Sequence, residues 1–141
     1  MRRRVCHRGK RGEAPCTCEM GNLYRFCEPI VLLALSRLGA AHGYQVAQET
    51  SPLSVTHAGM DSAAVYRTLR RLEAAGCVIS RWDTSGGGPA RRVYTLTPLG
   101  YRHLAEWMQV MDGIVASMAG LLREGRRTLK SRSLPAFRDT Q

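Results

Sequence analysis

Residues 61–76 read DSAAVYRTLRRLEAAG, and residues 77–100 continue with CVISRWDTSGGGPARRVYTLTPLG. The first stretch predicts a helix, because Asp61 or Ser62 can cap its first turn and Gly76 is typical of the position just after a helix. The second stretch predicts two strands joined by a glycine-rich turn. A helix followed at once by such a hairpin is the unit around which we interpret the rest of the chain.

The predicted helix separates its apolar side chains from its basic ones. At 100° per residue, one narrow arc carries Val65, Leu69 and Leu72. The opposite side and the two flanks carry small, basic and aromatic residues: Ala63, Arg67, Arg70 and Ala74, with Tyr66 and Arg71 at the edges. Such an outer face suits a DNA major groove, which is about 12 Å wide. An ordinary surface helix with solvated arginines has the same pattern, so this helix alone does not establish DNA binding.

The hairpin is predicted from alternation and turn residues. Residues 77–83 alternate, which places two pairs of side chains on opposite faces, Val78 with Trp82 and Ile79 with Arg81. Residues 85–89, SGGGP, form a flexible reversal, and residues 92–96 form the second strand. The turn is not a phosphate-binding loop, because no Lys-Ser/Thr follows its glycines. We expect Trp82 to pack in the core or on the hairpin.

Two further helices precede this unit. Apolar residues recur at helical spacing from Ile30 to Leu38, between Pro29 and Gly39. After a short break, residues 42–50 predict a shorter helix that Pro52 closes, and residues 51–60 predict a connecting loop. Three helices followed by a two-stranded hairpin with a basic tip are the layout of a winged helix-turn-helix. The fold class is therefore mainly α with a small β-hairpin.

A long helix is predicted after the hairpin. Thr97 is a capping residue, Pro98 suits the first helical position, and we expect the helix to reach about Arg127. Apolar side chains follow spacings of three and four residues along it: Leu104, Trp107, Met111, Ile114, Met118 and Leu121. A single-domain core could absorb this stripe, but a dimer seam explains better why so long a helix follows so small a domain. A dimer also supplies two recognition helices related by a two-fold axis.

Composition limits the class of protein. The chain has 141 residues, of which 44% are hydrophobic, with 21 Lys+Arg against 11 Asp+Glu and a net charge of +10. No apolar run approaches the roughly 20 residues of a membrane span. The basic start is not followed by an apolar stretch, so we do not expect a signal peptide. Five cysteines cannot all pair within one chain, which argues against a secreted disulfide scaffold. We expect a soluble cytoplasmic protein with a polyanion, double-stranded DNA, as partner and no membrane.

The positive charge is concentrated at the two ends. Residues 1–19 and 123–141 each carry six basic and two acidic side chains, whereas residues 20–122 carry nine and seven. We expect residues 1–25 and 128–141 to be flexible arms, either solvated tails or non-specific contacts to nucleic acid. Residues 26–97 would then form the winged helix-turn-helix domain and residues 98–127 the dimerisation helix. Specific DNA recognition has to come from the folded middle.

Three strings in this middle resemble the PadR family of bacterial transcriptional regulators. They are HGY at 42–44, AVYRTLRRLE at 64–73 with Gly76, and GGPARRVYTLT at 87–97 with Gly100. Together they cover about residues 28–110. The resemblance implies a homodimeric repressor that binds a palindromic operator and is released by a small effector, and it implies no enzymatic activity.

The resemblance also implies which residues meet DNA. On the recognition helix they would be Ser62, Ala63, Tyr66, Arg67 and Arg70, and on the wing Gly87, Arg91 and Arg92. Tyr66 could instead pack on the preceding helix. The family's drug-responsive members have an aromatic effector pocket at the dimer interface, where Trp107 would lie. An interface anchor without ligand is the favoured role for Trp107, because tryptophan is a common anchor. Effector identity is not readable from the sequence.

The cysteines outside the domain allow a different mechanism. Cys6, Cys16 and Cys18, with His7 nearby, are side chains that can ligate zinc or an iron–sulfur cluster. The alternative hypothesis is therefore a metal- or thiol-responsive regulator. Solvated thiols without a cofactor are the favoured interpretation of these cysteines, because no paired Cys-x2-Cys is present. We expect Cys77 to be a small buried residue. The other three histidines, His42, His57 and His103, have no neighbouring nucleophile or carboxylate pattern that predicts catalysis.

Overall fold

A computed structural model describes residues 26–54 and 60–132 of the chain. This part divides into two compact units, with the boundary between Ala105 and Glu106. It is mostly helical with one small antiparallel sheet, as the sequence predicted. Its elements are α2 (Cys27–Leu38), β1 (Ala40–His42), α3 (Gly43–Leu53), α4 (Ser62–Ala74), β2 (Val78–Asp83), β3 (Arg91–Leu96) and α5 (Pro98–Ser131).

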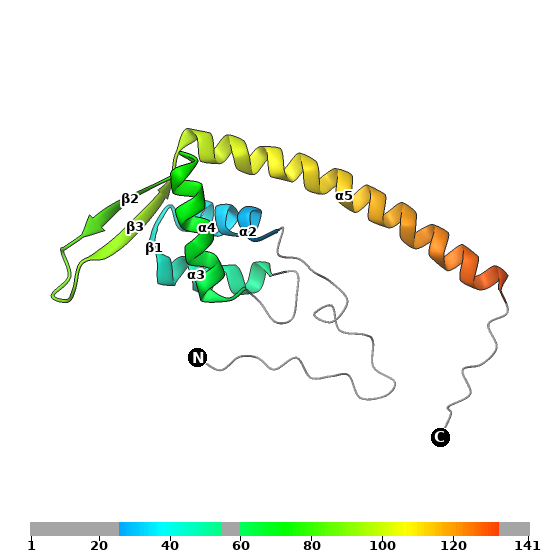
Figure 1. The fold of residues 1–141 in the computed structure, drawn as a ribbon, viewed down its shortest axis with the longest axis horizontal. Coiled ribbons are helices and arrows are strands. Elements are labelled where there is room, and N and C mark those ends of the chain that lie inside the picture. Colours follow the sequence, from blue (N-terminus) through cyan, green and yellow to red (C-terminus); the bar gives the residue numbers. More distant parts are fainter. Residues whose placement is uncertain (1–25, 55–59, 133–141) are drawn as a thin grey trace, which may run out of the picture. The chain divides into compact units, whose positions relative to one another are not determined.

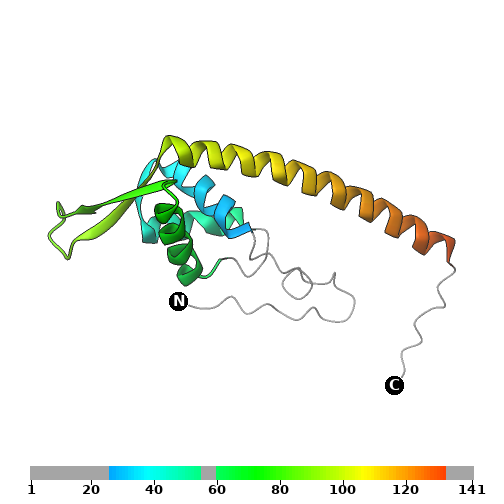
Figure 2. The same cartoon turned by 45° about the horizontal axis from the view of Figure 1, so that its top comes forward.

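The first unit has its core between the three short helices and the sheet. Figure 1 shows α2, α3 and α4 gathered beside the sheet, with the β2–β3 hairpin extending beyond them, and Figure 2 shows the same grouping from another side. The apolar arc predicted for α4 is confirmed, because Val65, Leu69 and Leu72 are all buried. Opposite them α2 buries its own apolar run, Ile30, Val31, Leu32, Ala34 and Leu35. Each fully buried aliphatic side chain contributes about 1.5–3 kcal/mol of transfer free energy.

Both ends of α4 are closed as the sequence predicted. The carboxylate of Asp61 accepts a hydrogen bond from the backbone N–H of Ala63 at 3.3 Å, so Asp61 is the N-cap. At the other end Gly76 has φ +77°, a left-handed conformation that glycine adopts without a Cβ penalty. The backbone N–H of Cys77 donates to Leu72 O at 2.9 Å, which completes the Schellman closure. The chain therefore leaves the helix in a defined direction toward β2.

The sheet has three strands in the order β1-β3-β2, whereas the sequence predicted only the two strands of the hairpin. The additional strand β1 pairs antiparallel with β3, with Ala41 opposite Tyr94. It is three residues long and has too little alternation to be predicted by itself. Because β1 covers the outer edge of β3, that strand is central, and it buries Val93 and Tyr94 on both of its faces.

Helix α3 differs from its prediction at the end. Pro52 was expected to close it, but the helix runs to Leu53 with Pro52 inside. A proline is tolerated in this last turn because only its own N–H is lost and no further turn follows. At its start, the side chain of Gln45 accepts from the backbone N–H of His42 at 2.9 Å, which satisfies a donor that the helix leaves open. Helix α2 also begins earlier than predicted, at Cys27.

Helix α5 begins as predicted and is longer than expected. The hydroxyl of Thr97 accepts from the backbone N–H of Gly100 at 3.1 Å, and Pro98 is the first helical residue. The helix ends at Ser131 rather than near Arg127. Among its described residues only Gly100 is buried. In the part of the chain that the structure describes, no helix is long and apolar enough to cross a membrane.

Candidate nucleic-acid interface

The outer face of α4 is basic and exposed. Arg67, Arg70 and Arg71 are all exposed, as is Ala63 in the first turn, while Ser62 is half-buried. The guanidinium groups of Arg67 and Arg71 lie near the thiol of Cys27 at the start of α2 and lower its pKa, but burial, the larger effect, raises the pKa overall. Cys27 therefore stays a neutral thiol at neutral pH, and it is not an activated thiolate.

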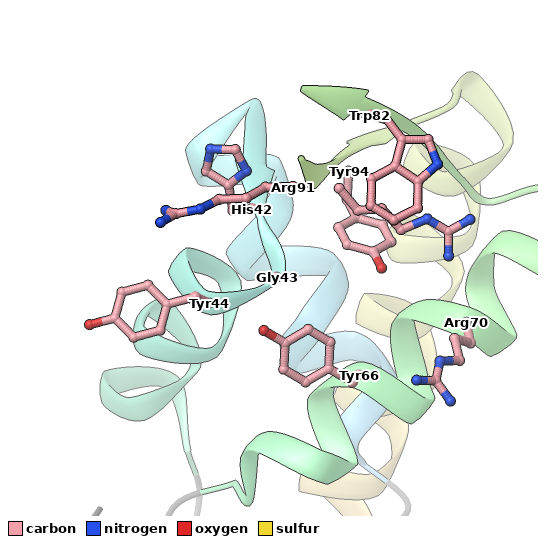
Figure 3. A pocket seen from close by; sticks show the side chains of 9 residues that line it. His42, Gly43, Tyr44, Tyr66, Arg70, Trp82, Arg91 and Tyr94 are labelled. Carbon is pink, nitrogen blue, oxygen red and sulfur yellow. The ribbon is translucent and has the colours of Figure 1, made fainter. Parts of the chain in front are cut away.

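Tyr66 lies on the flank of α4 and contacts the start of α3. A Cβ placed on Gly43 would come within 2.4 Å of the Tyr66 ring carbon Cε1, so the ring occupies the space that a side chain at position 43 would need. The side chain nevertheless remains 38% exposed. Tyr66 thus packs on α3 and still keeps part of its surface exposed. Packing on the preceding helix and contact with DNA are therefore both compatible with this position. Figure 3 shows the Tyr66 ring between α4 and Gly43.

A groove of about 650 Å³ lies between α3, α4 and the sheet. Figure 3 shows the aromatic and basic side chains that surround it. The described residues that line it are His42, Gly43, Tyr44, Tyr66, Arg70, Trp82, Arg91, Arg92 and Tyr94. Three of these are arginines and none is acidic, so the side chains that line the groove carry a net positive charge. Its walls come from the N-terminus of α3, the middle of α4 and the base of the wing.

The tip of the wing is a turn held by Asp83. Its carboxylate accepts hydrogen bonds from the hydroxyl of Ser85 at 2.5 Å and from the backbone N–H of Ser85 at 3.0 Å. These bonds lower the pKa of Asp83, with smaller contributions from the nearby His42 and Arg81. The following residues 86–89 are exposed and close the loop before β3. A second hollow of about 330 Å³ lies under this tip, between His42, Asp83 and Arg91.

Arg92 has a different environment from Arg91. Its guanidinium nitrogen Nη2 lies 3.9 Å from Oε2 of Glu73 on α4, and its Cζ lies 5.4 Å from the centre of the Trp82 ring. Trp82 is the direct cross-strand partner of Arg92. The other carboxylate oxygen of Glu73 accepts a hydrogen bond from the hydroxyl of Ser80 on β2. Trp82 is accordingly part of the hairpin's packing, although 63% of its surface is exposed.

Residues 31–106 match the model of the PadR-like family of transcriptional regulators. The chain belongs to the PadR-like family. The match covers more than half of the sequence and contains α3, α4, both strands of the wing and the start of α5. PadR-like proteins are transcriptional regulators that bind DNA and are not enzymes. The three sequence strings that resembled this family all lie within the matched range.

Solved structures of PadR-like regulators have the same fold. A PadR family transcriptional regulator from Eggerthella lenta is 28% identical, with a TM-score of 0.60 over 75% of this chain and 90% of that one. A PadR family regulator from Clostridium difficile shares 21% identity, with a TM-score of 0.59 over 69% of this chain and 98% of that one. A PadR-like regulator from Bacillus cereus shares 22% identity, with a TM-score of 0.58 over 71% and 94%. No curated protein sequence matches the chain.

Most of the DNA-binding residues expected for the PadR domain lie around one surface. Tyr66, Arg70, Arg91 and Arg92 line the same groove, and Gly87 lies in the second hollow beside Arg91. Ser62, Ala63 and Arg67 are on α4 but not in the groove lining. Tyr44 and Trp82 line the groove as well and were not predicted as site residues. The HGY string was the available signal for Tyr44, because it places a tyrosine in the first turn of α3.

The residues predicted for the dimer seam lie on α5. Leu104, Trp107, Met111 and Ile114 are half-buried, whereas Met118 and Leu121 are 63% and 75% exposed in the single chain. Cys6, Cys16 and Cys18 fall outside the described residues, so a metal site there stays a prediction. Within residues 26–54 and 60–132, no group of three His, Cys, Asp or Glu side chains is placed to hold a metal ion. Cys77 is buried, as predicted.

Proposed function

We propose that this PadR-like regulator is a homodimeric repressor that reads a palindromic operator with α4 and holds the DNA backbone with the wing. The observation that carries this proposal is the groove beside α4, whose described lining contains three arginines and no acid. Phosphate contacts by arginine supply affinity and register, while side chains that reach base edges in the major groove supply specificity. The proposed contacts on α4 are Ser62, Ala63, Tyr66, Arg67 and Arg70, and those on the wing are Gly87 and Arg91. Arg92 was also expected to contact DNA, but its guanidinium lies 3.9 Å from Glu73 and is set apart from this group.

The two kinds of contact divide between neighbouring parts of the surface. Arg67 lies on the outer face of α4, away from the groove lining, and is the residue for base contact in the major groove. Arg70 and Arg91 line the groove, where a phosphate of the DNA backbone is attracted by both guanidinium groups. The ring of Tyr66 fills the space above Gly43, and its hydroxyl adds a donor for the same backbone.

The apolar face of α5 supports a dimer. Besides the predicted seam, a third column of apolar side chains recurs every seven residues: Met108, Val115, Leu122 and Leu129. These four side chains are between 40% and 64% exposed in the single chain. An exposed apolar face of this length is typical of an interface between subunits, and its three columns are wider than a two-stranded seam requires. We infer that a second copy covers it, with Trp107 as an anchor or as the wall of an effector pocket.

The operator can be obtained by selecting bound duplexes from a random-sequence library with the full-length protein. We expect a two-fold site with half-sites about one helical turn apart, and affinity that falls steeply with salt. Arg67→Ala should reduce the preference for the selected site over random DNA by about 1–3 kcal/mol. Arg2→Ala removes the same charge from the basic N-terminal segment and should weaken both kinds of DNA about equally. Equal loss of preference in both variants would contradict reading by α4.

The dimer is tested separately on the same protein. Leu121→Glu places a charge in the proposed seam and should convert the dimer to monomer in sedimentation equilibrium, because an unpaired charge is costly to bury. Arg123→Glu, two residues away on the polar side, is the matched control and should leave the dimer intact. Repression and its release are then measured with a reporter behind the selected operator, in the presence and absence of candidate effectors.

A further inference from the structure

We propose that Arg92 is a positioning residue that fixes the wing to the recognition helix, and that Arg91 is the wing arginine that contacts DNA. The two arginines are neighbours on β3, and both follow the basic tip. They differ in the side chains that surround their guanidinium groups. The proposal rests on the DNA-binding function proposed above, but its first test needs no DNA.

Glu73 connects the two elements. It lies one residue before the end of α4, and its carboxylate reaches both strands of the hairpin at once. One oxygen accepts from the hydroxyl of Ser80 on β2, and the other lies 3.9 Å from Nη2 of Arg92 on β3. Helix α4 carries the residues proposed to contact bases. A connection at Glu73 therefore fixes the position of the wing relative to this recognition helix.

Trp82 is a second contact of the Arg92 guanidinium. The 5.4 Å separation between Cζ and the ring centre is within the range of a cation–π contact. Trp82 and Arg92 are also directly paired across the two strands, so their side chains lie on the same face of the sheet. The guanidinium is thus close to both a carboxylate and an aromatic ring, two groups that stabilise its charge.

Arg91 has no such arrangement. Its side chain is exposed, and no ion pair or aromatic contact within the described residues holds it. It lines both the groove beside α4 and the hollow under the wing tip. Since neighbouring residues of a strand point to opposite faces, Arg91 is also on the face away from Glu73 and Trp82. Asp83 is the cross-strand partner of Arg91 and lines the same hollow, but its carboxylate accepts from Ser85 and lies 3.8 Å from Nε2 of His42. The guanidinium of Arg91 is therefore left available for a phosphate.

The first test is hydrogen exchange of the DNA-free, full-length protein. We expect Arg92→Ala and Glu73→Gln each to speed exchange of the backbone amides in residues 78–96, and the double variant to be no faster than the faster single one, because both changes break one connection. Arg91→Ala is the matched control and should leave the exchange of these residues unchanged. Additive effects of the two changes, or unchanged exchange in Arg92→Ala, would overturn the proposed connection.

The second test measures affinity against salt on a duplex selected from a random library. Arg91→Ala should reduce the slope of log K against log[salt] by about 0.9, the value for one phosphate contact. Arg92→Ala should weaken binding by about five- to tenfold with the slope unchanged, since an exposed ion pair and a cation–π contact together have that magnitude. Glu73→Gln should weaken binding in the same direction, because the wing loses its support.

Arg92→Lys separates charge from shape. Lysine keeps the charge but lacks the planar group that stacks on an indole ring, so we expect it not to restore affinity. Full affinity in Arg92→Lys, or a slope reduced by about 0.9 in Arg92→Ala, would overturn the proposal and make Arg92 a phosphate contact. If no duplex is selected at all, the DNA-binding function fails, while hydrogen exchange still decides whether Arg92 and Glu73 connect wing and helix.

Discussion

Within residues 26–54 and 60–105 the chain buries an apolar core within itself, whereas from Glu106 to Ser131 its apolar side chains lie on the surface of one helix. Leu69 and Leu32 have no exposed surface, while Leu121 is 75% exposed. The two regions are similarly rich in leucine, valine and methionine, so composition does not separate them. The difference lies in what covers the apolar face. In the first region other elements of the same chain do so, and in the second we propose a second copy.

The largest expected effect is the loss of a core side chain. Leu69→Ala should lower the free energy of unfolding by about 2–5 kcal/mol, because the side chain is fully buried and its loss leaves a cavity in the core that α4 forms with the elements packed against it. Urea denaturation measures this loss, and it should be the same at every protein concentration. Leu121→Ala should instead have an effect that grows with protein concentration, since it acts only where two copies meet. A concentration-independent loss in Leu121→Ala would remove the distinction between the two regions.

The same change at two glycines of α5 should have opposite signs. A Cβ on Gly100 would lie 2.1 Å from the backbone oxygen of Cys77, so Gly100→Ala should destabilise the domain by about 1–3 kcal/mol in thermal or urea unfolding. The cause is a close approach between α5 and the turn after α4, where Thr97 also donates to Gly76 O at 2.6 Å. A neutral result would show that this junction can shift without cost.

Gly113 is the counterpart in the second region. A Cβ at this position would meet nothing within 4 Å, so Gly113→Ala should stabilise the helix by about 0.5–1 kcal/mol. Helical circular dichroism and the unfolding midpoint measure the gain. Gly125, which is equally open, provides a second site for the same change. A loss of stability at Gly113 would show that another copy approaches closely on that side of the helix.

The smallest expected effect concerns the wing tip and its dependence on pH. The pKa of Asp83 is lowered mainly by hydrogen bonds from Ser85, so the folded turn favours the charged carboxylate. Its contribution to the turn is therefore present above the ordinary pKa of an aspartate and is lost as the pH falls through the lowered value. A carbon-detected NMR titration should show the low pKa, and Ser85→Ala should raise it. An unchanged pKa in Ser85→Ala would show that the Ser85 hydroxyl does not cause the shift, and would leave the backbone N–H of residue 85, His42 and Arg81 as its causes.

Local signals in the sequence predicted both ends of α4 and the start of α5 correctly. Asp61, Gly76 and Thr97 act where they were expected because caps depend on a few neighbouring backbone groups. Strand β1 was missed because three residues carry no periodicity, and it exists only through pairing with β3. Pro52 was misjudged because its effect depends on how many turns follow it. Each of these errors concerns an interaction that the local sequence does not contain.

The candidate interface likewise has features that the sequence predicts and features that only the tertiary structure shows. The chain's own pattern determined which side of α4 is apolar, that a basic hairpin follows it, and that α5 carries a long apolar stripe. Only the tertiary structure decided that Arg92 faces Glu73 while Arg91 does not, and that the Tyr66 ring occupies the space left by Gly43. The periodicity of a helix or strand is a property of residues close in sequence, and it can be counted. Which arginine pairs with which carboxylate depends on segments that the fold brings together. The spacing of residues in the sequence does not predict such a pair.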